Sequence, residues 1–144
     1  MGELNAMAMT ALDYEEIRQL LARYNFAIDL GDAVGWAACF TDDGAFECSG
    51  VPDGSPFGGR HAGVTALQAY ATTHFSMAKG HARHWNWNLE IDGDGEVATM
   101  RCYMLALSVG KPPTVAGSTG IYRDRLCKVD GRWLFVERHI TVDG

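Results

Sequence analysis

Apolar and polar residues alternate along residues 84–91, where the chain reads HWNWNLEI. A period of two is typical of a β-strand, because successive side chains of a strand point to opposite faces of the sheet. Such a strand has an apolar face and a polar face: Trp85, Trp87, Leu89 and Ile91 on the first, His84, Asn86, Asn88 and Glu90 on the second. The apolar face belongs in a core or an interface. The polar face either meets water, which is the commoner outcome, or lines a polar pocket.

Three- and four-residue apolar spacing predicts a long first helix from Leu12 to a stop at Gly31. Asp13 is the expected N-cap of this helix, because its carboxylate can accept hydrogen bonds from free backbone N–H groups. Asp29 falls in the last turn, where the negative end of the helix dipole disfavours a carboxylate. Either a partner elsewhere in the chain holds Asp29, or Asp29 begins a turn in water. The apolar stripe of the helix consists of Ile17, Leu20, Leu21, Tyr24 and Ile28.

Shorter elements are expected after the first helix, because Gly, Pro and acidic residues interrupt the chain more often there. The segment Gly50–Gly59, rich in Gly, Pro, Ser and Asp, is a loop and a candidate lid or rim of a pocket. The other elements are a helix from Asp32 through Trp36 to Phe40, a turn over 41–44, a strand over 45–48, and a helix from near Gly63 to about Met77.

The second half of the chain predicts strand after strand, separated by turn signals such as Asp92-Gly93-Asp94-Gly95. Three helices followed by antiparallel strands predict an α+β fold, with the helices on one face of a curved sheet. At 144 residues the chain has the size of one domain. We expect that domain over residues 11–144 and a flexible tail over residues 1–10. The predicted strands span residues 81–91, 97–109, 115–129 and 132–142.

Composition narrows the classes of partner. The chain has 12 Lys and Arg against 18 Asp and Glu, a net charge of −6, and the basic residues are scattered. It therefore lacks the basic surface that nucleic-acid or anionic-membrane binding requires. The four cysteines lie far apart without metal-ligand spacing, no apolar run is long enough to span a membrane, and no nucleotide-binding glycine loop is present. We expect a cytoplasmic protein with free thiols, no metal and no cofactor.

Several segments of the chain resemble one known family. A first helix that ends in YNFAIDLGD is followed by WAACFTDDGAFE, by RHWNWNLEIDGD, and finally by GIYRDRLCKVDGRWLFVERHI. This arrangement resembles the nuclear transport factor 2-like superfamily, in particular its SnoaL-like branch, over nearly the whole chain. The resemblance implies a cone-shaped fold in which three helices on the concave face of a curved antiparallel or mixed sheet enclose a deep apolar pocket. This fold supports many reactions, and some of its members catalyse none.

Two enzymes of the superfamily, scytalone dehydratase and hexachlorocyclohexane dehydrochlorinase, use an Asp at the end of the first helix and a His on the strand after the third helix. By resemblance, Asp29 and His84 occupy these positions. The active-site arginine of the dehydrochlorinase corresponds to Arg138, whereas its lysine falls at Tyr24, which instead matches the oxyanion tyrosine of ketosteroid isomerase. The carboxylate base of that isomerase falls at Cys48, and the Asp-Arg-Asp set of limonene-epoxide hydrolase has no match.

An Asp–His pair suits β-elimination. A neutral imidazole takes a proton from carbon when its accepting nitrogen faces the substrate, and a carboxylate on the other N–H fixes that tautomer and stabilises the imidazolium. We therefore predict that His84, oriented by Asp29, is the general base of a cofactor-independent, dehydratase-like lyase acting on a small, mostly apolar cyclic or polycyclic substrate. The alternative is a non-catalytic small-molecule-binding or accessory protein. An isomerase or polyketide cyclase of the same fold is a further alternative.

Five further residues are candidate substrate contacts: Tyr24, Trp36, Asn86, Tyr103 and Arg138. The two tyrosines are candidate hydrogen-bond donors to a developing enolate, but Tyr24 also suits core packing and Tyr103 suits either face of its strand. Trp36 is core or pocket wall, and Asn86 shares the polar face of His84. Arg138 either binds a substrate anion or pairs with a surface carboxylate. The surface candidates for that pairing are Glu90 and Glu137.

The remaining histidines carry no sign of a chemical role. His61, His74, His81 and His139 have no identified partner, and we expect them to be structural or exposed.

The long strands predict an oligomer. Apolar residues occur on both faces of the strand over 97–109, so helices on one face cannot cover them all. A homodimer that packs sheet against sheet is therefore expected. The resemblance agrees, although the superfamily also contains trimers.

Overall fold

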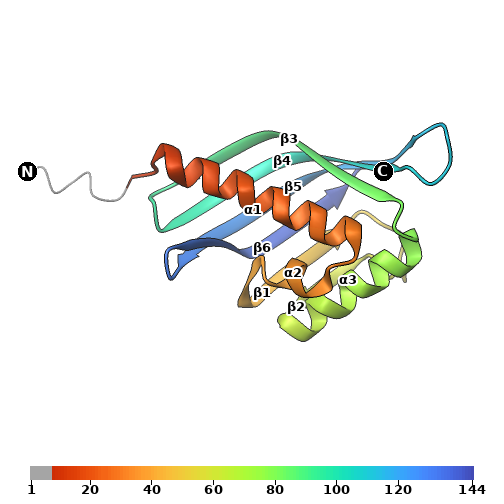
Figure 1. Cartoon of the computed structure of the whole chain (residues 1–144), viewed down its shortest axis with the longest axis horizontal. Helices are drawn as coiled ribbons and strands as arrows, with labels where there is room; N and C mark the ends of the chain where they lie inside the picture. The colour runs from red at the N-terminus through yellow and green to blue at the C-terminus, as the bar shows by residue number, and fades with distance from the viewer. Residues whose placement is uncertain (1–7) are drawn as a thin grey trace, which may run out of the picture.

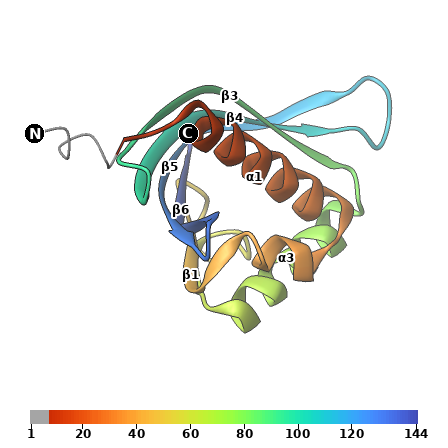
Figure 2. The same cartoon turned by 60° about the vertical axis from the view of Figure 1, so that its left-hand side comes forward.

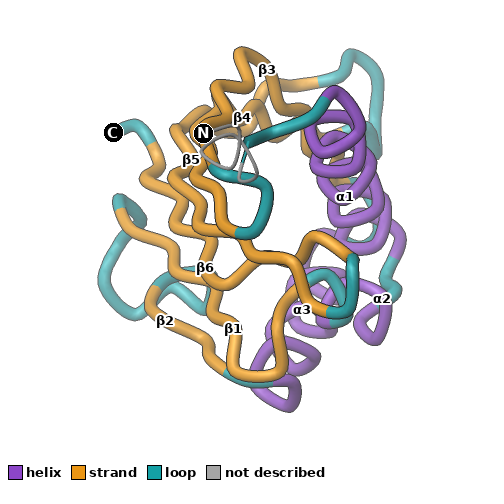
Figure 3. The backbone as a smooth tube through the Cα atoms, turned by 90° about the vertical axis from the view of Figure 1, so that its left-hand side faces the viewer, coloured by secondary structure: helices purple, strands orange, loops and turns teal. Residues whose placement is uncertain are grey.

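Helix α1 (Ala11–Leu30) lies in the hollow of a curved β-sheet, as the computed structural model of residues 8–144 shows (Figure 1). The short α2 (Ala33–Ala37) and α3 (Val64–Ala78) pack beside the C-terminal end of α1 and against one edge of the sheet (Figure 2). All three helices are on the same face of the sheet (Figure 3). The predicted α+β class with helices on one face is confirmed.

The sheet has six strands in the order β2-β1-β6-β5-β4-β3. The neighbours β1 and β6, second and third in this order, are parallel and all other neighbours are antiparallel, so the sheet is mixed. The four strands expected in the second half are present, and the short β2 was not predicted. The strands are β1 (Phe40–Ser49), β2 (Gly59–Ala62), β3 (Ala82–Gly93), β4 (Val97–Ser108), β5 (Val115–Val129) and β6 (Arg132–Val142).

The N-terminus of α1 corrects one sequence prediction. Thr10, not Asp13, is the N-cap, because the Thr10 hydroxyl accepts the backbone N–H of Asp13 at 3.1 Å. The Asp13 carboxylate in turn accepts a hydrogen bond from the Thr10 backbone N–H at 2.9 Å, which completes a capping box. Its other oxygen accepts the indole N–H of Trp133 at 3.0 Å and lies 2.8 Å from Lys128 Nζ. This carboxylate therefore ties the start of α1 to the sheet.

The predicted tail of residues 1–10 lies mostly outside the described part of the chain, since the description begins at residue 8. Met9 packs against the core and Thr10 caps α1. At the other end of α1, Gly31 ends the helix as expected, with a φ of 83° that favours glycine. A Cβ at this position would meet the Phe75 ring at 2.9 Å, so the turn also needs the small residue.

Two irregularities in the strands were not predicted. The residues expected to form a turn over 41–44 belong to β1, whose register with β6 shifts between Phe40 and Ala45. In β3 the register with β4 shifts between Trp87 and Glu90, and Asn88 has a φ of 56°. This bulge inserts one residue into the alternation.

The bulge at Asn88 redistributes the residues of β3 between the two faces. Trp85 and Trp87 are 50% and 48% exposed on the outer face, whereas Leu89 and Ile91 pack against the core. The prediction that these four residues share one face is therefore wrong. His84 and Asn86 precede the bulge and contact α1, so the polar residues before the bulge point inward, whereas Glu90 lies after it on the outer face.

Candidate active site

The carboxylate of Asp29, in the last turn of α1, is held by His84 of β3. One oxygen accepts the backbone N–H of His84 at 2.9 Å, and the other lies 2.5 Å from His84 Nδ1. The two side chains are only 8% and 13% exposed. These two bonds explain how a carboxylate persists at the negative end of a helix. Of the two interpretations left open by the sequence, the structure shows the one in which a partner holds Asp29.

The contact with Asp29 defines the tautomer of the His84 ring. A neutral imidazole that donates from Nδ1 carries its free lone pair on Nε2. Within residues 8–144, Nε2 makes no hydrogen bond to the protein. The ring therefore has an oriented nitrogen on one side and an accepting nitrogen free on the other, which is the arrangement that proton abstraction requires.

Arg138 is fully buried, which excludes the expected alternative of a surface pair. Its guanidinium forms a two-point ion pair with Asp124, at 2.8 Å from Nε and 3.2 Å from Nη2. The group also lies 3.7 Å from the ring centre of Tyr122 and 4.5 Å from that of Tyr24. Its Nη1 is buried without a hydrogen-bond partner among the described residues, 8–144. Burial opposes the charge, but Asp124 raises the pKa of Arg138 further above its ordinary value, so it stays protonated.

Tyr24 and Trp36 form part of one aromatic cluster next to Arg138. Their ring centres lie 5.4 Å apart, and Trp36 also stacks on Tyr70 at 5.6 Å. Both side chains are buried, and Trp36 Nε1 has no hydrogen-bond partner. Burial raises the pKa of the Tyr24 hydroxyl, so this group is a neutral donor. The cluster joins Arg138 at the sheet to the face of α3.

Asn86 and Tyr103 differ in their relation to the site. The Asn86 side chain accepts from Asn25 Nδ2 at 2.6 Å and donates to the Tyr103 backbone oxygen at 3.0 Å, so it links α1, β3 and β4. The Tyr103 side chain is 53% exposed on the outer face, where it pairs with Trp87 across the strands. Tyr103 is therefore not a substrate contact beside His84, and that prediction is wrong. The inward positions of β4 hold Cys102 and Met104 instead.

Three residues near the site were missed in the sequence. Asp124 occurs at period two with Tyr122 and Leu126, and this inward position in an apolar strand face marks it as a buried charge. His74 follows Leu67, Tyr70 and Ala71 at helical spacing, so it belongs to the inward stripe of α3 rather than to the surface. Asn25 precedes Asp29 by one helical turn and faces the same strand.

A pocket of about 300 Å³ is lined by residues that neighbour His84 in β3 and β4, although its wall does not include Asp29, His84 or His74. Its wall includes Ala82 and Ala106, and Ala106 pairs directly with His84 between β3 and β4. Phe57, from the loop that the sequence marked as a candidate rim, forms another side. Larger depressions of about 410 and 620 Å³ lie elsewhere, and neither includes Asp29 or His84. We call the first space the mouth pocket.

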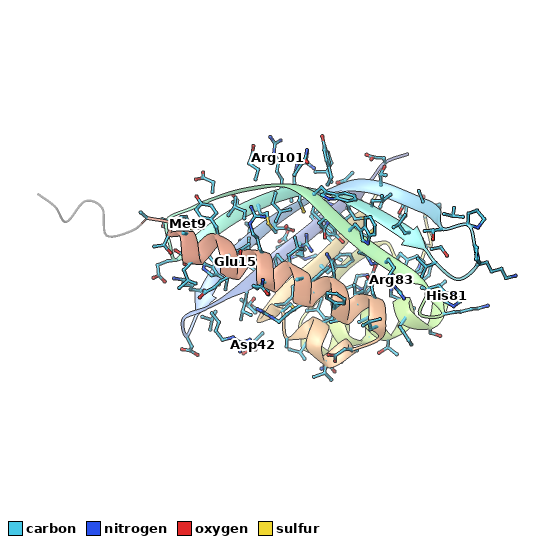
Figure 4. All side chains as sticks on the ribbon, turned by 45° about the horizontal axis from the view of Figure 1, so that its top comes forward. Met9, Glu15, Asp42, His81, Arg83 and Arg101 are labelled. Carbon is cyan, nitrogen blue, oxygen red and sulfur yellow. The ribbon has the colours of Figure 1, made fainter. Side chains whose placement is uncertain are left out.

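The outer face of the sheet carries charges that do not reach this site. Arg101 lies on that face (Figure 4). It pairs with Glu90 at 2.8 Å, and Glu137 pairs with Arg125 at 3.2 Å. Within residues 8–144, no cluster of three His, Cys, Asp or Glu side chains is arranged to hold a metal ion. In the same described part of the chain, no helix combines the length and the apolar character needed to cross a membrane.

The architecture and the sequence together identify the family. Residues 9–139 match the SnoaL-like domain. The chain belongs to the SnoaL-like family. This assignment confirms the resemblance seen in the sequence, including its nuclear transport factor 2-like fold. No curated protein matches the SnoaL-like chain.

Solved structures support the same assignment. A variant of Rv3472, a function unknown protein from Mycobacterium tuberculosis, is 35% identical with a TM-score of 0.78, over 93% of this chain and 78% of that one. A Catenulispora acidiphila protein in complex with S-DNPA is 26% identical with a TM-score of 0.75, over 93% and 96% of the two chains. A nuclear transport factor 2-like protein with a cystatin-like fold from Novosphingobium aromaticivorans is 23% identical with a TM-score of 0.78. The match covers 90% of this chain and 81% of that one, and it supports the fold alone.

Proposed function

We propose that this SnoaL-like protein is a cofactor-independent lyase that catalyses dehydratase-like β-elimination on a small, mostly apolar cyclic or polycyclic substrate. The observation that carries the proposal is the buried contact between Asp29 and His84, with the accepting nitrogen of His84 left free. Asp29 fixes the ring and stabilises the charge that the ring acquires. His84 is the catalytic base, and Asp29 is its orienting partner.

In the proposed step, His84 Nε2 takes a proton from the carbon next to a substrate carbonyl. The electron pair of the broken C–H bond forms the new C=C bond, and the C–O bond to the leaving hydroxyl breaks with its electrons on oxygen. The proton held on Nε2 then passes to that oxygen, so water leaves and His84 returns to its neutral state. An adjacent carbonyl is needed because an unactivated C–H is far too weak an acid for imidazole.

Buried polar atoms support a ligand with its own polar group. Arg138 Nη1 and Trp36 Nε1 are buried donors without partners, and buried donors are normally satisfied in folded proteins. A substrate oxygen that becomes negative during elimination suits a fixed, permanently charged donor. We therefore assign Arg138, Tyr24 and Trp36 to substrate binding, with Asn86 holding the strand that carries His84. The S-DNPA complex of the Catenulispora acidiphila protein is consistent with a small-molecule site in this family.

The alternative is a protein that binds the same small molecule without catalysis. An isomerase of the ketosteroid type is less well supported, because Cys48 faces the core where that mechanism needs a carboxylate. Glu47, its neighbour, points outward and lies 3.3 Å from Arg60. A polyketide cyclase of the same fold would use the same concave site.

Turnover of a panel of cyclic β-hydroxyketones, from one ring to three fused rings, tests the proposal. We expect dehydration by the wild type, and a fall in kcat of about 10²- to 10⁴-fold for His84→Gln, as for loss of a general base. Asp29→Asn should lose activity in the same range, because the amide no longer favours the accepting tautomer. Equal rates in wild type and His84→Gln would overturn the lyase. Binding of the panel without any turnover would favour the non-catalytic alternative.

A further inference from the structure

His74 of α3 is a second imidazole beside the Asp29–His84 pair. Its ring centre lies 5.2 Å from that of His84, with the rings inclined at 44°. His74 Nδ1 is buried and has no hydrogen-bond partner in the part of the chain that the structure describes. The mechanism described above makes no use of this residue, although it is the nearest aromatic neighbour that the structure shows for His84.

The surroundings of His74 keep its ring uncharged. Burial, followed by repulsion from His84, lowers the pKa of His74 to about 4, although the charge of Asp29 opposes both effects. The His74 ring also packs against two other aromatic rings. Its centre lies 6.3 Å from the ring centre of Tyr70 and 5.5 Å from that of Phe57. At neutral pH the ring is therefore a neutral imidazole, with one N–H donor and one acceptor nitrogen.

Packing alone does not account for a histidine at this position. Its neighbours Phe57 and Tyr70 are aromatic, and a phenylalanine would make comparable ring contacts. A buried imidazole nitrogen without a partner destabilises the folded protein, a cost that phenylalanine avoids. An unpaired polar atom at the edge of a candidate site indicates that a ligand supplies the missing partner.

The mouth pocket is the nearest space through which a ligand could approach His74. Phe57 lines that pocket and also packs edge-on against the His74 ring. Ala106 lines the same pocket and pairs with His84. A molecule in the mouth pocket therefore contacts a neighbour of each imidazole.

We propose that His74 is a substrate-binding residue, whose neutral imidazole hydrogen-bonds to a hydroxyl or carbonyl oxygen of the molecule that His84 acts on. This inference rests on the proposed function for the identity of the base, but the ligand contact at His74 does not require turnover. No proton is transferred through His74. Its role is to select ligands that carry an uncharged oxygen close to the carbon facing His84, and to fix their orientation.

Binding of cyclohexanone tests the contact without any reaction, because this ketone has no group to eliminate. The side-chain nitrogens of histidine are followed by ¹⁵N NMR in the full-length protein while cyclohexanone is added up to its solubility limit. We expect the resonances of His74 to shift on addition, and those of His139, on the outer face, to remain in place. Unchanged His74 resonances across the whole titration would overturn the inference.

Steady-state kinetics on the best β-hydroxyketone of the panel provide the second test. His74→Phe removes the hydrogen bond and fills the space, and should raise KM about tenfold, the effect of losing roughly one hydrogen bond. His74→Gln keeps a donor and an acceptor and should recover most of that loss, while His139→Gln should behave as wild type. A structural role predicts instead that both His74 variants lower the melting temperature and leave KM unchanged, which would contradict the proposal.

The two proposals fail separately. If no β-hydroxyketone is dehydrated, the lyase fails, but a cyclohexanone shift at His74 still supports the ligand contact. If His84→Gln is inactive and His74→Phe retains the wild-type KM, the lyase stands and the contact at His74 is wrong.

Discussion

The two buried charge pairs of the concave face differ in what they can do. Asp29 and His84 retain slight exposure, and an imidazole is the side chain that most often transfers protons in enzymes. Arg138 and Asp124 are 0% exposed, and an arginine does not lose its proton in a protein. The first pair is therefore suited to proton transfer. The second can provide only a constant field and fixed donors, which suits the stabilisation of charge that develops on a substrate.

The fixed pair gives a prediction for stability. Asp124→Asn leaves the buried Arg138 without its countercharge, and we expect the free energy of unfolding to fall by about 3–5 kcal/mol, the usual effect of breaking a buried ion pair. Urea denaturation at neutral pH measures this loss. Glu137→Gln is the matched control, because it removes two partly exposed ion pairs on the same sheet, with Arg125 and Arg60, each worth about 1 kcal/mol or less. A loss in Asp124→Asn no larger than in the control would show that the pair is not a net requirement for folding.

The sequence marked Asp29 and His84 as unusual but left the partner of Arg138 open, and the difference has a physical reason. Asp29 and His84 stood out because each was unusual locally, one at the wrong end of a helix and one on the polar side of an aromatic strand. Arg138 was ambiguous because its partner depends on the register of β5 against β6, which places Asp124 opposite it and Glu137 next to it on the outer face. Register is a property of two strands together, and neither strand specifies it alone.

At the scale of elements, α1 is held at both ends by its own carboxylates. Asp13 attaches its first turn to Trp133 and Lys128, and Asp29 attaches its last turn to β3. The helix is therefore fixed across the full length of the hollow. This arrangement sets the depth at which Asp29 meets His84, so the N-terminal anchor also contributes to the geometry of the site.

Asp13 makes the stability of this anchor depend on pH. The hydrogen bond from Lys128, followed by that from the Thr10 backbone, holds the pKa of Asp13 well below its ordinary value in the folded protein. A group whose pKa is lower in the folded state adds stability above its unfolded pKa, about 3.9, and that stability is lost as the pH falls through the folded value. Asp13→Asn should therefore lower the free energy of unfolding at pH 7 by about 1.5–3 kcal/mol, as expected for bonds to a charged group.

Urea denaturation of wild type and Asp13→Asn at a series of pH values measures this effect. The difference between them should be full from pH 7 to about pH 5 and should shrink below about pH 4, where the unfolded aspartate becomes protonated. Asp42→Asn, at an exposed position in β1, should match the wild type throughout. A difference that stays constant down to the lowest pH would show that charge on Asp13 is not what holds the helix.

The elements themselves were predictable wherever periodicity ran without interruption. The C-terminal end of α1, the extent of α3 and the four strands of the second half follow from apolar spacing and from Gly31 or the Asp-Gly turns, whereas the N-cap of α1 did not. The bulge at Asn88 and the irregular start of β1 were not predictable, because one inserted residue changes the face of every residue after it while leaving composition unchanged. The error at Asn88 did not affect His84, which lies before the bulge.

At the scale of the whole molecule, the sheet has one covered face and one bare face. The helices cover the concave side (Figure 3), and Trp85, Trp87 and Tyr103 are about half exposed on the other. The two tryptophan rings pack edge to face at 5.3 Å, so they form one rigid aromatic surface. Beside it, a single row across all six strands carries mixed charge. That row consists of Glu90, Arg101, Arg123, His139, Glu47 and Arg60.

We expect a second copy of this chain to cover the bare face, as the sequence predicted. A face with an aromatic half and a half of mixed charge can pair with itself about a two-fold axis, because acidic and basic positions of one copy then meet basic and acidic positions of the other. A stable interface needs about 800 Å² per partner. The mass of one chain is 15.7 kDa. Sedimentation equilibrium should therefore give twice this value, whereas three times this value would indicate the trimer also known in the superfamily.

Substitution of the aromatic surface tests where that contact lies. Trp87→Glu together with Tyr103→Glu places charge at the centre of the proposed interface, and the mass should fall to that of the monomer because burying an unpaired carboxylate is strongly unfavourable. Leu12→Glu, at an equally exposed position on α1, should leave the oligomer intact. Since neither Trp87 nor Tyr103 reaches the concave side, the monomeric variant should keep its helical content and its affinity for cyclohexanone. A wild type that remains monomeric at its highest soluble concentration would instead assign the aromatic surface to a different partner.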